Sequence, residues 1–309
     1  MATDILISSS SVDPLSVPSA EESLKKTEAN EFGFQRSDMY SLNLSNSVEP
    51  YHRHMFLVYK KVENWASFVE KTENDSLPAL LASALKSHAD KTPIKTRLTF
   101  CEGPYGTESS DGDLFVFPEM LKYNGLTSND ADKFVEDVLA NGQDWISGPV
   151  ERLEGSYVFV CCHIARDKRC GTCGPQLIKK FKEEIGSRGL KDQIFVGPCS
   201  HLGQHKFAGN LTIFSRNSSG EVTGHWYGYA TPEDVPAMLD QHIGNGDIIK
   251  KIWRGQMLAF PTQDRQQVVE GGGEKGKKEE SQASTGGGDL VKDAGGCFQG
   301  LNGVSCCRN

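Results

Sequence analysis

The sequence lacks the features that define several large classes of protein. It contains no run of about 18 apolar residues, the minimum for a membrane-spanning helix, and its first thirty residues lack the apolar core of a secretory signal. It also lacks a basic excess: the formal net charge is -8 at pH 7, whereas binding to nucleic-acid phosphates needs a basic face. We therefore expect a cytoplasmic protein that has neither membranes nor nucleic acids as partners.

The two ends of the chain are poor in apolar residues and are expected to be disordered. Residues 1–31 form a Ser-rich leader, in which four acidic residues contradict the acid-poor, Arg-rich composition of an organelle transit peptide: Asp4, Asp13, Glu21 and Glu22. Residues 263–309 contain GGGEKGKKEESQASTGGG, which has no apolar period with which to build a core. This tail also carries Cys297, Cys306 and Cys307, to which the sequence assigns no role.

Between the ends, strand-like and helix-like segments alternate twice over, although no strong residue-level repeat links the two halves. The first half, residues 32–150, has strand patterns at 54–62, 94–101 and 113–118 and helix patterns at 77–88 and 129–142. The second half, residues 151–262, has strand patterns at 156–162, 193–197, 210–216 and 224–230 and helix patterns at 174–188 and from Thr231 onward. The β-α-β-β-β-α order of the second half is thioredoxin-like. We therefore predict an α/β protein with two tandem thioredoxin-like domains.

Cysteine is distributed very unevenly along the chain. There are nine cysteines, an odd number, and five of them fall within one 39-residue window: Cys161, Cys162, Cys170, Cys173 and Cys199. A disulfide framework would spread them, so in a reducing compartment this clustering indicates metal or redox chemistry.

The loops after two predicted strands should bring most of these cysteines together with histidines. Strand 156–162 and strand 193–197 are expected to be parallel neighbours, and ligands gather beyond the carboxyl ends of such strands. The side chains expected in this neighbourhood are Cys161, Cys162, His163, Cys170, Cys173, Cys199, His201 and His205. This set exceeds what one site requires.

One hypothesis is a dithiol at CGTC, formed by Cys170 and Cys173 in front of a helix whose dipole would lower a thiol pKa. An eight-residue insertion that contains RDKR separates this motif from the preceding strand, and the histidines would then have no role. A second hypothesis is a structural zinc site that joins Cys170 and Cys173 to Cys199 and His201, or to His201 and His205. The residues alone leave both hypotheses open.

A third arrangement uses the spacing Cys161-x8-Cys170 together with His201-x3-His205. In VCCHIARDKRCG and SHLGQHKFAGN, and in GDLFVFPEMLKYNGL and TPEDVPAMLDQHIG, the sequence resembles the sucrase/ferredoxin-like family of thioredoxin-fold ferredoxins. The resemblance covers roughly residues 32 to 260 and is plant-like, extending to GVSCC at the terminus.

This resemblance implies a 2Fe-2S cluster with Cys161 and Cys170 on one iron and His201 and His205 on the other. Such a protein would exchange single electrons with redox partner proteins, as an electron carrier or a redox sensor. Neutral imidazoles in place of two thiolates raise the reduction potential, and their ring nitrogens lead us to expect a pH-dependent potential. Cys162, Cys173 and Cys199 would be additional thiols close by.

Two further features of the sequence bear on function. Basic residues surround the predicted site, and as a group they would steer an acidic partner: Arg166, Lys168, Arg169, Lys179, Lys180, Lys182 and Lys206. The family label also raises sucrose cleavage, which needs two positioned carboxylates. No motif in the sequence pairs acidic residues in this way, so hydrolysis is disfavoured.

Overall fold

The computed structural model describes residue 27 and residues 31–71, 73–92 and 94–259. The predicted C-terminal tail, including Cys297, Cys306 and Cys307, lies outside these residues, as does the predicted leader apart from residues 27 and 31. The described residues all belong to one compact unit.

The first half has the order predicted from the sequence, with two additional short strands, one before and one after its second helix. Its elements are β1 (Arg53–Val58), α2 (Leu77–Ser87), β2 (Thr96–Cys101), β3 (Leu114–Phe117), β4 (Leu121–Tyr123), α3 (Ala131–Lys133), which continues as a wider helical stretch over Phe134–Ala140, and β5 (Val150–Arg152). The Ser76 side chain caps α2 by accepting a hydrogen bond from the Ala79 amide.

The second half confirms the predicted β-α-β-β-β-α order. Its elements are β6 (Ser156–Cys161), α4 (Lys168–Ser187), β7 (Ile194–Cys199), β8 (Leu211–Arg216), β9 (Val222–Tyr227), α5 (Val235–Ala237), which continues over Met238–Ile243, and β10 (Trp253–Gln256). Thr231 and Asp234 form the predicted capping box at the start of the last helical segment. β10 was not predicted and pairs with β9.

The ten strands of the described residues belong to one sheet, in the order β10-β9-β8-β6-β7-β2-β1-β3-β4-β5. In each half the first strand lies between a parallel second strand and an antiparallel third strand. The halves meet where β2 pairs with β7, in register at Cys101 and Cys199. The fold is therefore mixed α/β with one continuous sheet, and its division into two thioredoxin-like domains at residue 150 stays a prediction.

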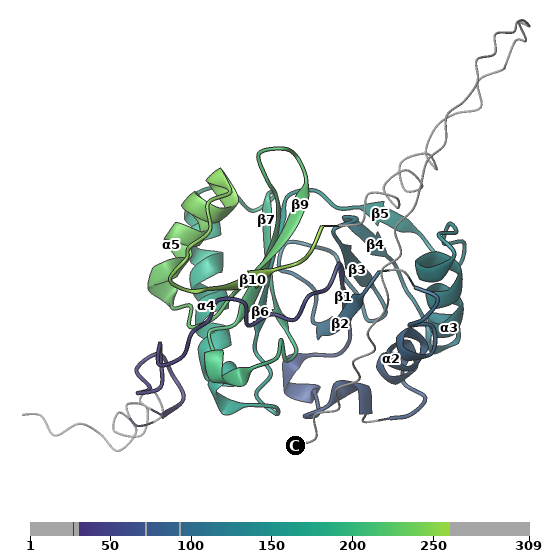
Figure 1. Cartoon of the computed structure of the whole chain (residues 1–309), viewed down its shortest axis with the longest axis horizontal. Helices are drawn as coiled ribbons and strands as arrows, with labels where there is room; N and C mark the ends of the chain where they lie inside the picture. Colours follow the sequence, from purple (N-terminus) through teal and green to yellow (C-terminus); the bar gives the residue numbers. More distant parts are fainter. Residues whose placement is uncertain (1–26, 28–30, 72, 93, 260–309) are drawn as a thin grey trace, which may run out of the picture. The chain divides into compact units, whose positions relative to one another are not determined.

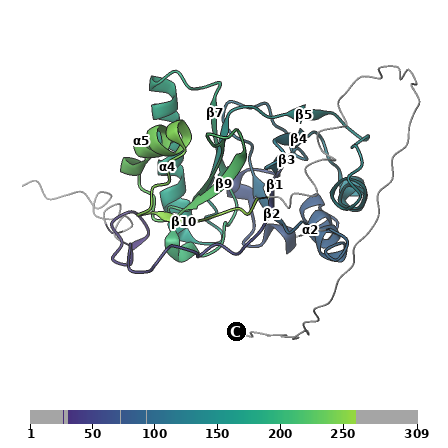
Figure 2. The same ribbon diagram turned by 45° about the horizontal axis from the view of Figure 1, so that its top comes forward.

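The helices of the two halves lie on the outside (Figures 1 and 2). Aromatic side chains fill the space between the halves. Along β1, Met55 and Leu57 pack with the helices of the first half, whereas Phe56 faces inward and stacks on Phe159 of β6, with ring centroids 3.7 Å apart. Burying each such ring contributes on the order of 1.5–3 kcal/mol. Alternation along the strands thus joins the halves through one aromatic core.

The main local difference from the prediction is the start of α4, which begins at Lys168 and not at Gly174. Asp167 caps it, since its side chain accepts a hydrogen bond from the Arg169 amide at 2.9 Å. Gly174 and Pro175 are poor helix formers, but packing overrides propensity here. A Cβ at Gly174 would lie 2.4 Å from the Cys161 carbonyl oxygen, so the glycine lets the helix approach the end of β6 closely.

Within the described residues, no helix is long and apolar enough to span a lipid bilayer.

Candidate metal centre

The site lies where two parallel neighbouring strands end. β6 ends at Cys161 and β7 ends at Cys199, and these two residues are paired in register. The β6–α4 loop and the β7–β8 loop therefore leave the sheet at the same edge, as the sequence predicted.

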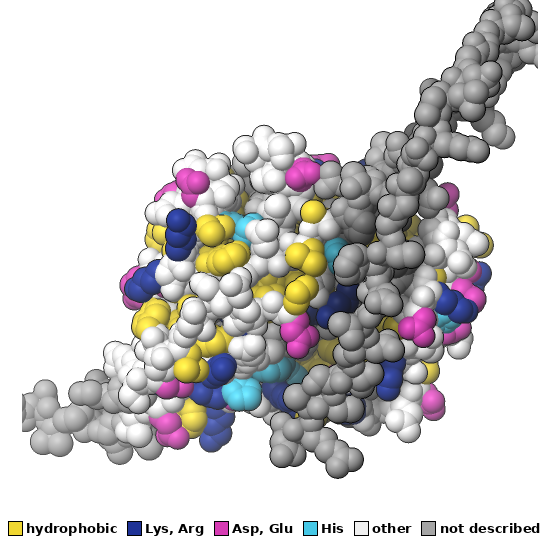
Figure 3. Space-filling view, in the orientation of Figure 1, with side chains coloured by type: hydrophobic (Ala, Val, Ile, Leu, Met, Phe, Trp, Pro, Cys, Tyr) yellow, Lys and Arg dark blue, Asp and Glu magenta, His cyan; other side chains and the backbone are white. Residues whose placement is uncertain are grey.

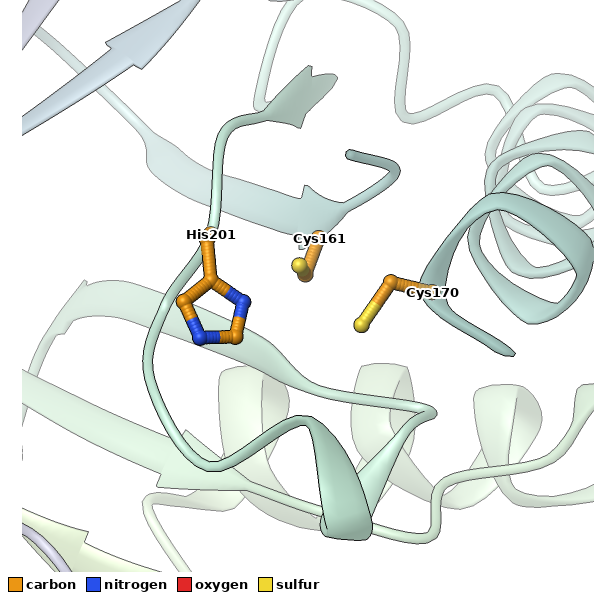
Figure 4. Close-up of side chains that lie close together, drawn as sticks. All are labelled: Cys161, Cys170 and His201. Atoms are coloured by element: carbon orange, nitrogen blue, oxygen red, sulfur yellow. The ribbon is translucent and has the colours of Figure 1, made fainter. Parts of the chain in front are cut away.

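Three of the four predicted ligands converge on one point. The Sγ atoms of Cys161 and Cys170 and one ring nitrogen of His201 all lie within 4.8 Å of one another. Cys161 comes from the end of β6, Cys170 from the first turn of α4, and His201 from the β7–β8 loop, and their side chains point toward one another (Figure 4). Both cysteines are buried at 1 % exposure. This is a preformed group of soft and borderline ligands.

One nitrogen of the His201 ring makes no hydrogen bond within the described residues. Its Nδ1 is buried and has no hydrogen-bond partner among the described residues. Buried polar atoms are normally paired, so an unpaired nitrogen that faces two thiols indicates a site for a metal.

His163 holds the loop that carries His201. Its Nδ1 accepts a hydrogen bond from the His201 amide at 3.3 Å, so its proton lies on Nε2, which donates to the Ala66 carbonyl oxygen at 2.9 Å. Burial lowers the pKa of His163, in keeping with a neutral ring. Because both nitrogens are occupied, His163 is a supporting residue and not a ligand.

Cys161 and Cys170 form a coupled thiol pair. The hydrogen bond from Cys170 lowers the pKa of Cys161 well below its usual value, and the same bond raises the pKa of Cys170. Of the two thiols, Cys161 is therefore the easier one to deprotonate, although the residue is fully buried. A buried thiolate needs a cation, and a bound metal would supply it.

His205, the fourth predicted ligand, lies next to this group but is not part of it. Its ring centroid is 5.7 Å from that of His201, its Nε2 is 3.9 Å from Asp167 Oδ2, and its side chain is 48 % exposed. Its role as a ligand stays a prediction, and of the predicted ligands it is the one that faces solvent.

Cys173, the second cysteine of CGTC, is held away from the group. Its Sγ donates to the Phe32 carbonyl oxygen and accepts a hydrogen bond from Arg36, both at 3.5 Å. Burial raises the pKa of Cys173 to about 11, which outweighs the predicted effect of the helix N-terminus. A reactive dithiol needs an accessible thiolate, so this geometry does not favour the dithiol hypothesis.

The remaining nearby cysteines are buried thiols outside the group. Burial raises the pKa values of both Cys162 and Cys199 well above the usual range. Alternation along β6 places Cys162 on the opposite face from Cys161, among the residues that pack under α4.

Sequence reasoning missed three arginines that hold the β7–β8 loop. Arg36 donates to the Ala208 carbonyl oxygen at 2.6 Å, Arg97 to that of Leu202 at 3.2 Å, and Arg254 to Asn210 Oδ1 at 2.8 Å. These arginines lie far from the loop in the sequence, and no local pattern marks them. The loop that presents His201 and His205 is thus fixed from three directions.

Comparisons with known proteins agree with a ferredoxin-related family. The profile of the sucrase/ferredoxin-like family matches residues 44–255. The chain is 27 % identical over 260 residues to Altered inheritance of mitochondria protein 32 of Kluyveromyces lactis, a match that covers 70 % of this chain and 78 % of that protein. It is 38 % identical over 100 residues to the protein of the same name from Debaryomyces hansenii, covering 32 % and 35 % of the two chains.

A third relative is Actin patches distal protein 1 of Saccharomyces cerevisiae, 28 % identical over 149 residues, with coverage of 42 % of this chain and 46 % of that one. The D. hansenii and S. cerevisiae matches thus span less than half of the relatives' length. These three relatives are fungal, and the plant-like assignment stays a prediction.

Among solved structures, the chain is similar to a thioredoxin-like [2Fe-2S] ferredoxin from Aquifex aeolicus at 20 % identity, over 33 % of this chain and 98 % of that one, with a TM-score of 0.26. At this TM-score the likeness carries no weight for the site. The family profile, in contrast, covers most of the described residues. The chain belongs to the sucrase/ferredoxin-like family.

Proposed function

We propose that the protein binds a 2Fe-2S cluster and works as a one-electron carrier or redox sensor. Cys161 and Cys170 would hold one iron, and His201 and His205 the other. The observation that carries this proposal is the buried Nδ1 of His201, which has no partner among the described residues and belongs to a group with two buried thiols.

The donor atoms fit the chemistry of such a cluster. Thiolates ligate iron–sulfur clusters, and in Rieske centres two imidazoles replace two thiolates on one iron and raise the potential. When bound, the cluster supplies one-electron redox chemistry. The chain supplies a low-pKa thiol at Cys161, a neutral imidazole at His201, and aromatic packing that keeps water away from the cysteines.

His205 is the residue through which the site would exchange protons with water. It is half exposed, and Asp167 Oδ2 lies 3.9 Å from its Nε2; desolvation lowers the pKa of His205, and the charge of Asp167 acts against this shift. We therefore propose that electron uptake is coupled to protonation of a histidine. A reduction potential that stays flat between about pH 6 and 10, the range around imidazole titration, would refute the coupling.

The ligand assignment is tested by metal analysis of protein purified without oxygen. We expect iron and acid-labile sulfide in equal amounts, and His201→Cys should keep a cluster with an altered spectrum and a lower potential. Cys173→Ser is the matched control, because Cys173 lies in the same helix turn as Cys170 but bonds to Phe32 and Arg36. Loss of the cluster in Cys173→Ser would overturn the assignment.

A single zinc ion is the second candidate, because the three ligand atoms lie close enough together for one metal. Zinc without sulfide in the anaerobic protein would establish this alternative and exclude the cluster. A colourless, metal-free protein that reduces insulin disulfides would instead support the dithiol at Cys170 and Cys173.

We propose that the redox partner has an acidic surface, which docks on the basic residues around the metal centre of this protein. Arg166 lies in the β6–α4 loop, Lys168 begins α4, and Lys206 lies in the β7–β8 loop. None of the three has an ion pair within the described residues; their charges instead lie over the rings of Phe68, Phe32 and Phe207. In Figure 3, histidine and basic side chains gather at the lower edge of the molecule. The neighbouring carboxylates Asp38 and Asp167 are already paired with Arg169.

This docking proposal predicts a charge-dependent rate of electron transfer. Lys206→Glu should slow transfer to an acidic ferredoxin about tenfold at low salt and have little effect in 0.5 M salt, because of screening. Lys86→Glu on α2 changes the net charge equally and is the control. Equal rates for the two variants would contradict docking at the site loops.

The compartment is also a proposal. The cytoplasmic prediction stands beside relatives whose name refers to mitochondrial inheritance. Fractionation of cells that express the full chain would decide between the cytosol and mitochondria.

A further inference from the structure

Two arginines pack against the ring of one buried tryptophan. The guanidinium carbon of Arg97 is 4.7 Å from the centroid of the Trp226 ring, and that of Arg254 is 5.5 Å from it. Arg254 is 2 % exposed and Trp226 is 1 % exposed. Trp226 belongs to the same core cluster as Cys161 and Cys170.

Neither arginine has an ion-pair partner in the part of the chain that the structure describes. Arg97 donates to the Leu202 carbonyl oxygen, and Arg254 to Asn210, to the Gly203 carbonyl oxygen and to Ser47, all of which are neutral acceptors. In contrast, the buried Arg53 in the first half is paired with Glu119.

A buried cation without a counter-charge is costly, so its presence calls for an anion. Burial and, to a smaller extent, the charge of Arg97 lower the pKa of Arg254 to about 10, whereas the charges of Cys161 and Cys170 act in the opposite direction. Asn210, which accepts from Arg254 through its side chain, also accepts a hydrogen bond from the Cys161 amide at 2.9 Å through its carbonyl oxygen, so one residue links the guanidinium to a proposed ligand. Both arginines also bond to the loop that carries His201 and His205.

We propose that the buried Arg254 and the partly buried Arg97 are counter-charges of the metal centre and raise its reduction potential. This inference rests on the cluster proposed above. Two thiolates and two neutral imidazoles leave an oxidised 2Fe-2S unit without net charge, and one electron from an external one-electron donor gives it a charge of -1. The two fixed cations stabilise this reduced state more than the oxidised state.

The test is a redox titration of the cluster-containing protein with dithionite and mediators. Arg254→Met should shift the potential downward, so that at a fixed mediator potential the ratio of reduced to oxidised protein falls by about tenfold or more. Arg254→Lys keeps the charge and should restore most of that ratio. Arg97→Gln should shift the potential in the same direction. Because Arg97 is less buried than Arg254, this variant provides the test if Arg254→Met does not fold.

Arg53→Met is the matched control, because it removes a buried arginine that already has a carboxylate partner in the other half. It should destabilise the protein and leave the potential unchanged. A second readout is thermal unfolding with and without the cluster: Arg254→Met should cost more stability in the reduced, cluster-containing protein than in the metal-free protein.

The outcomes separate this inference from the proposed function. A normal cluster whose potential is the same in wild type, Arg254→Met and Arg97→Gln would overturn the counter-charge role and leave the cluster assignment standing. A wild-type protein that binds no iron and no sulfide would overturn the proposed function itself.

Discussion

The two halves of the molecule use the same strand order, but only one of them carries a candidate site. In the first half, β1 and β2 end at Val58 and Cys101, and the loops that follow, residues 59–76 and 102–113, contain no cysteine or histidine. In the second half, β6 and β7 end at Cys161 and Cys199. The predicted ligands are Cys161 itself, Cys170 in the first turn of α4, and His201 and His205 in the loop after β7. The shared strand order creates an edge of the sheet where parallel strands end in each half. The sequence at that edge decides which half has candidate metal ligands.

The first half nevertheless contributes to the site by holding its loops. The Ala66 carbonyl oxygen fixes His163, Ser67 donates to the Ala165 carbonyl oxygen at 2.6 Å, and Arg97 holds Leu202. The first half, which contains none of the proposed ligands, thus holds the ligands of the second half in position. The second half carries the proposed ligands and the first half holds them in position. The following predictions test this contrast.

The largest effect is expected from replacing, one at a time, a buried cysteine that ends a strand in each half. Cys161→Ser should remove nearly all bound iron, because it deletes a proposed ligand, and Cys101→Ser should leave the iron content unchanged. Placing a hydroxyl at the fully buried Cys101 should still cost about 1–3 kcal/mol of stability. Iron analysis and urea unfolding measure the two effects, and iron loss in Cys101→Ser would break the contrast between the halves.

The aromatic core between the halves should be the largest determinant of stability outside the site. Phe159→Ala removes the ring that stacks on Phe56 and should lower the free energy of unfolding by about 3–5 kcal/mol. Ile146→Ala, at a side chain that is 82 % exposed, is the control and should have almost no effect. Two separate unfolding transitions in Phe159→Ala would show that the halves fold independently.

A buried histidine pair in the second half should make stability depend on pH. His225 accepts a hydrogen bond from Trp253, His242 accepts one from Tyr227, and the two imidazole rings are 4.8 Å apart. Burial lowers their pKa values from 6.5 to about 4 and about 3. The unfolded chain therefore binds protons below pH 6.5 that the folded chain does not, and stability falls as pH drops from 6.5 toward 3.

Between pH 6.5 and 5 the expected loss is about 2 kcal/mol for each histidine of the pair. In metal-free protein, His242→Phe should reduce this loss by about that amount, as measured by urea unfolding at the two pH values. An unchanged pH dependence would mean that His242 takes up a proton in the folded protein.

A smaller effect is expected where the first half supports the site through His163. Removing its ring in His163→Ala frees the His201 amide and should weaken metal retention against a chelator by about 10- to 100-fold. His163→Asn keeps an acceptor close to the His201 amide and should lose less. Equal retention in wild type and His163→Ala would show that the first half does not position the ligands.

The sequence predicted the element order and the meeting of the two loops, because strands, helices and their caps leave local patterns such as Thr231 with Asp234. It also predicted three residues that converge, Cys161, Cys170 and His201. It did not predict β4, β5 or β10, which are only three or four residues long.

What the sequence could not indicate depends on contacts between distant segments. The start of α4 was misplaced because Gly174 is read locally as a helix breaker, whereas its actual role is close packing against Cys161. Arg36, Arg97 and Arg254 likewise have no motif, since each meets the ligand loop only after folding. The burial that raises the pKa of Cys173 is also a property of the folded chain.

The central claim is that two cysteines and two histidines bind one cluster, and it is tested most directly by electron paramagnetic resonance of the reduced protein labelled with ¹⁵N-histidine. We predict hyperfine coupling to histidine nitrogens in wild type, with one of two nitrogen couplings lost in His205→Cys and the cysteine ligands unaffected. A cluster signal without coupling to any histidine nitrogen would contradict this assignment.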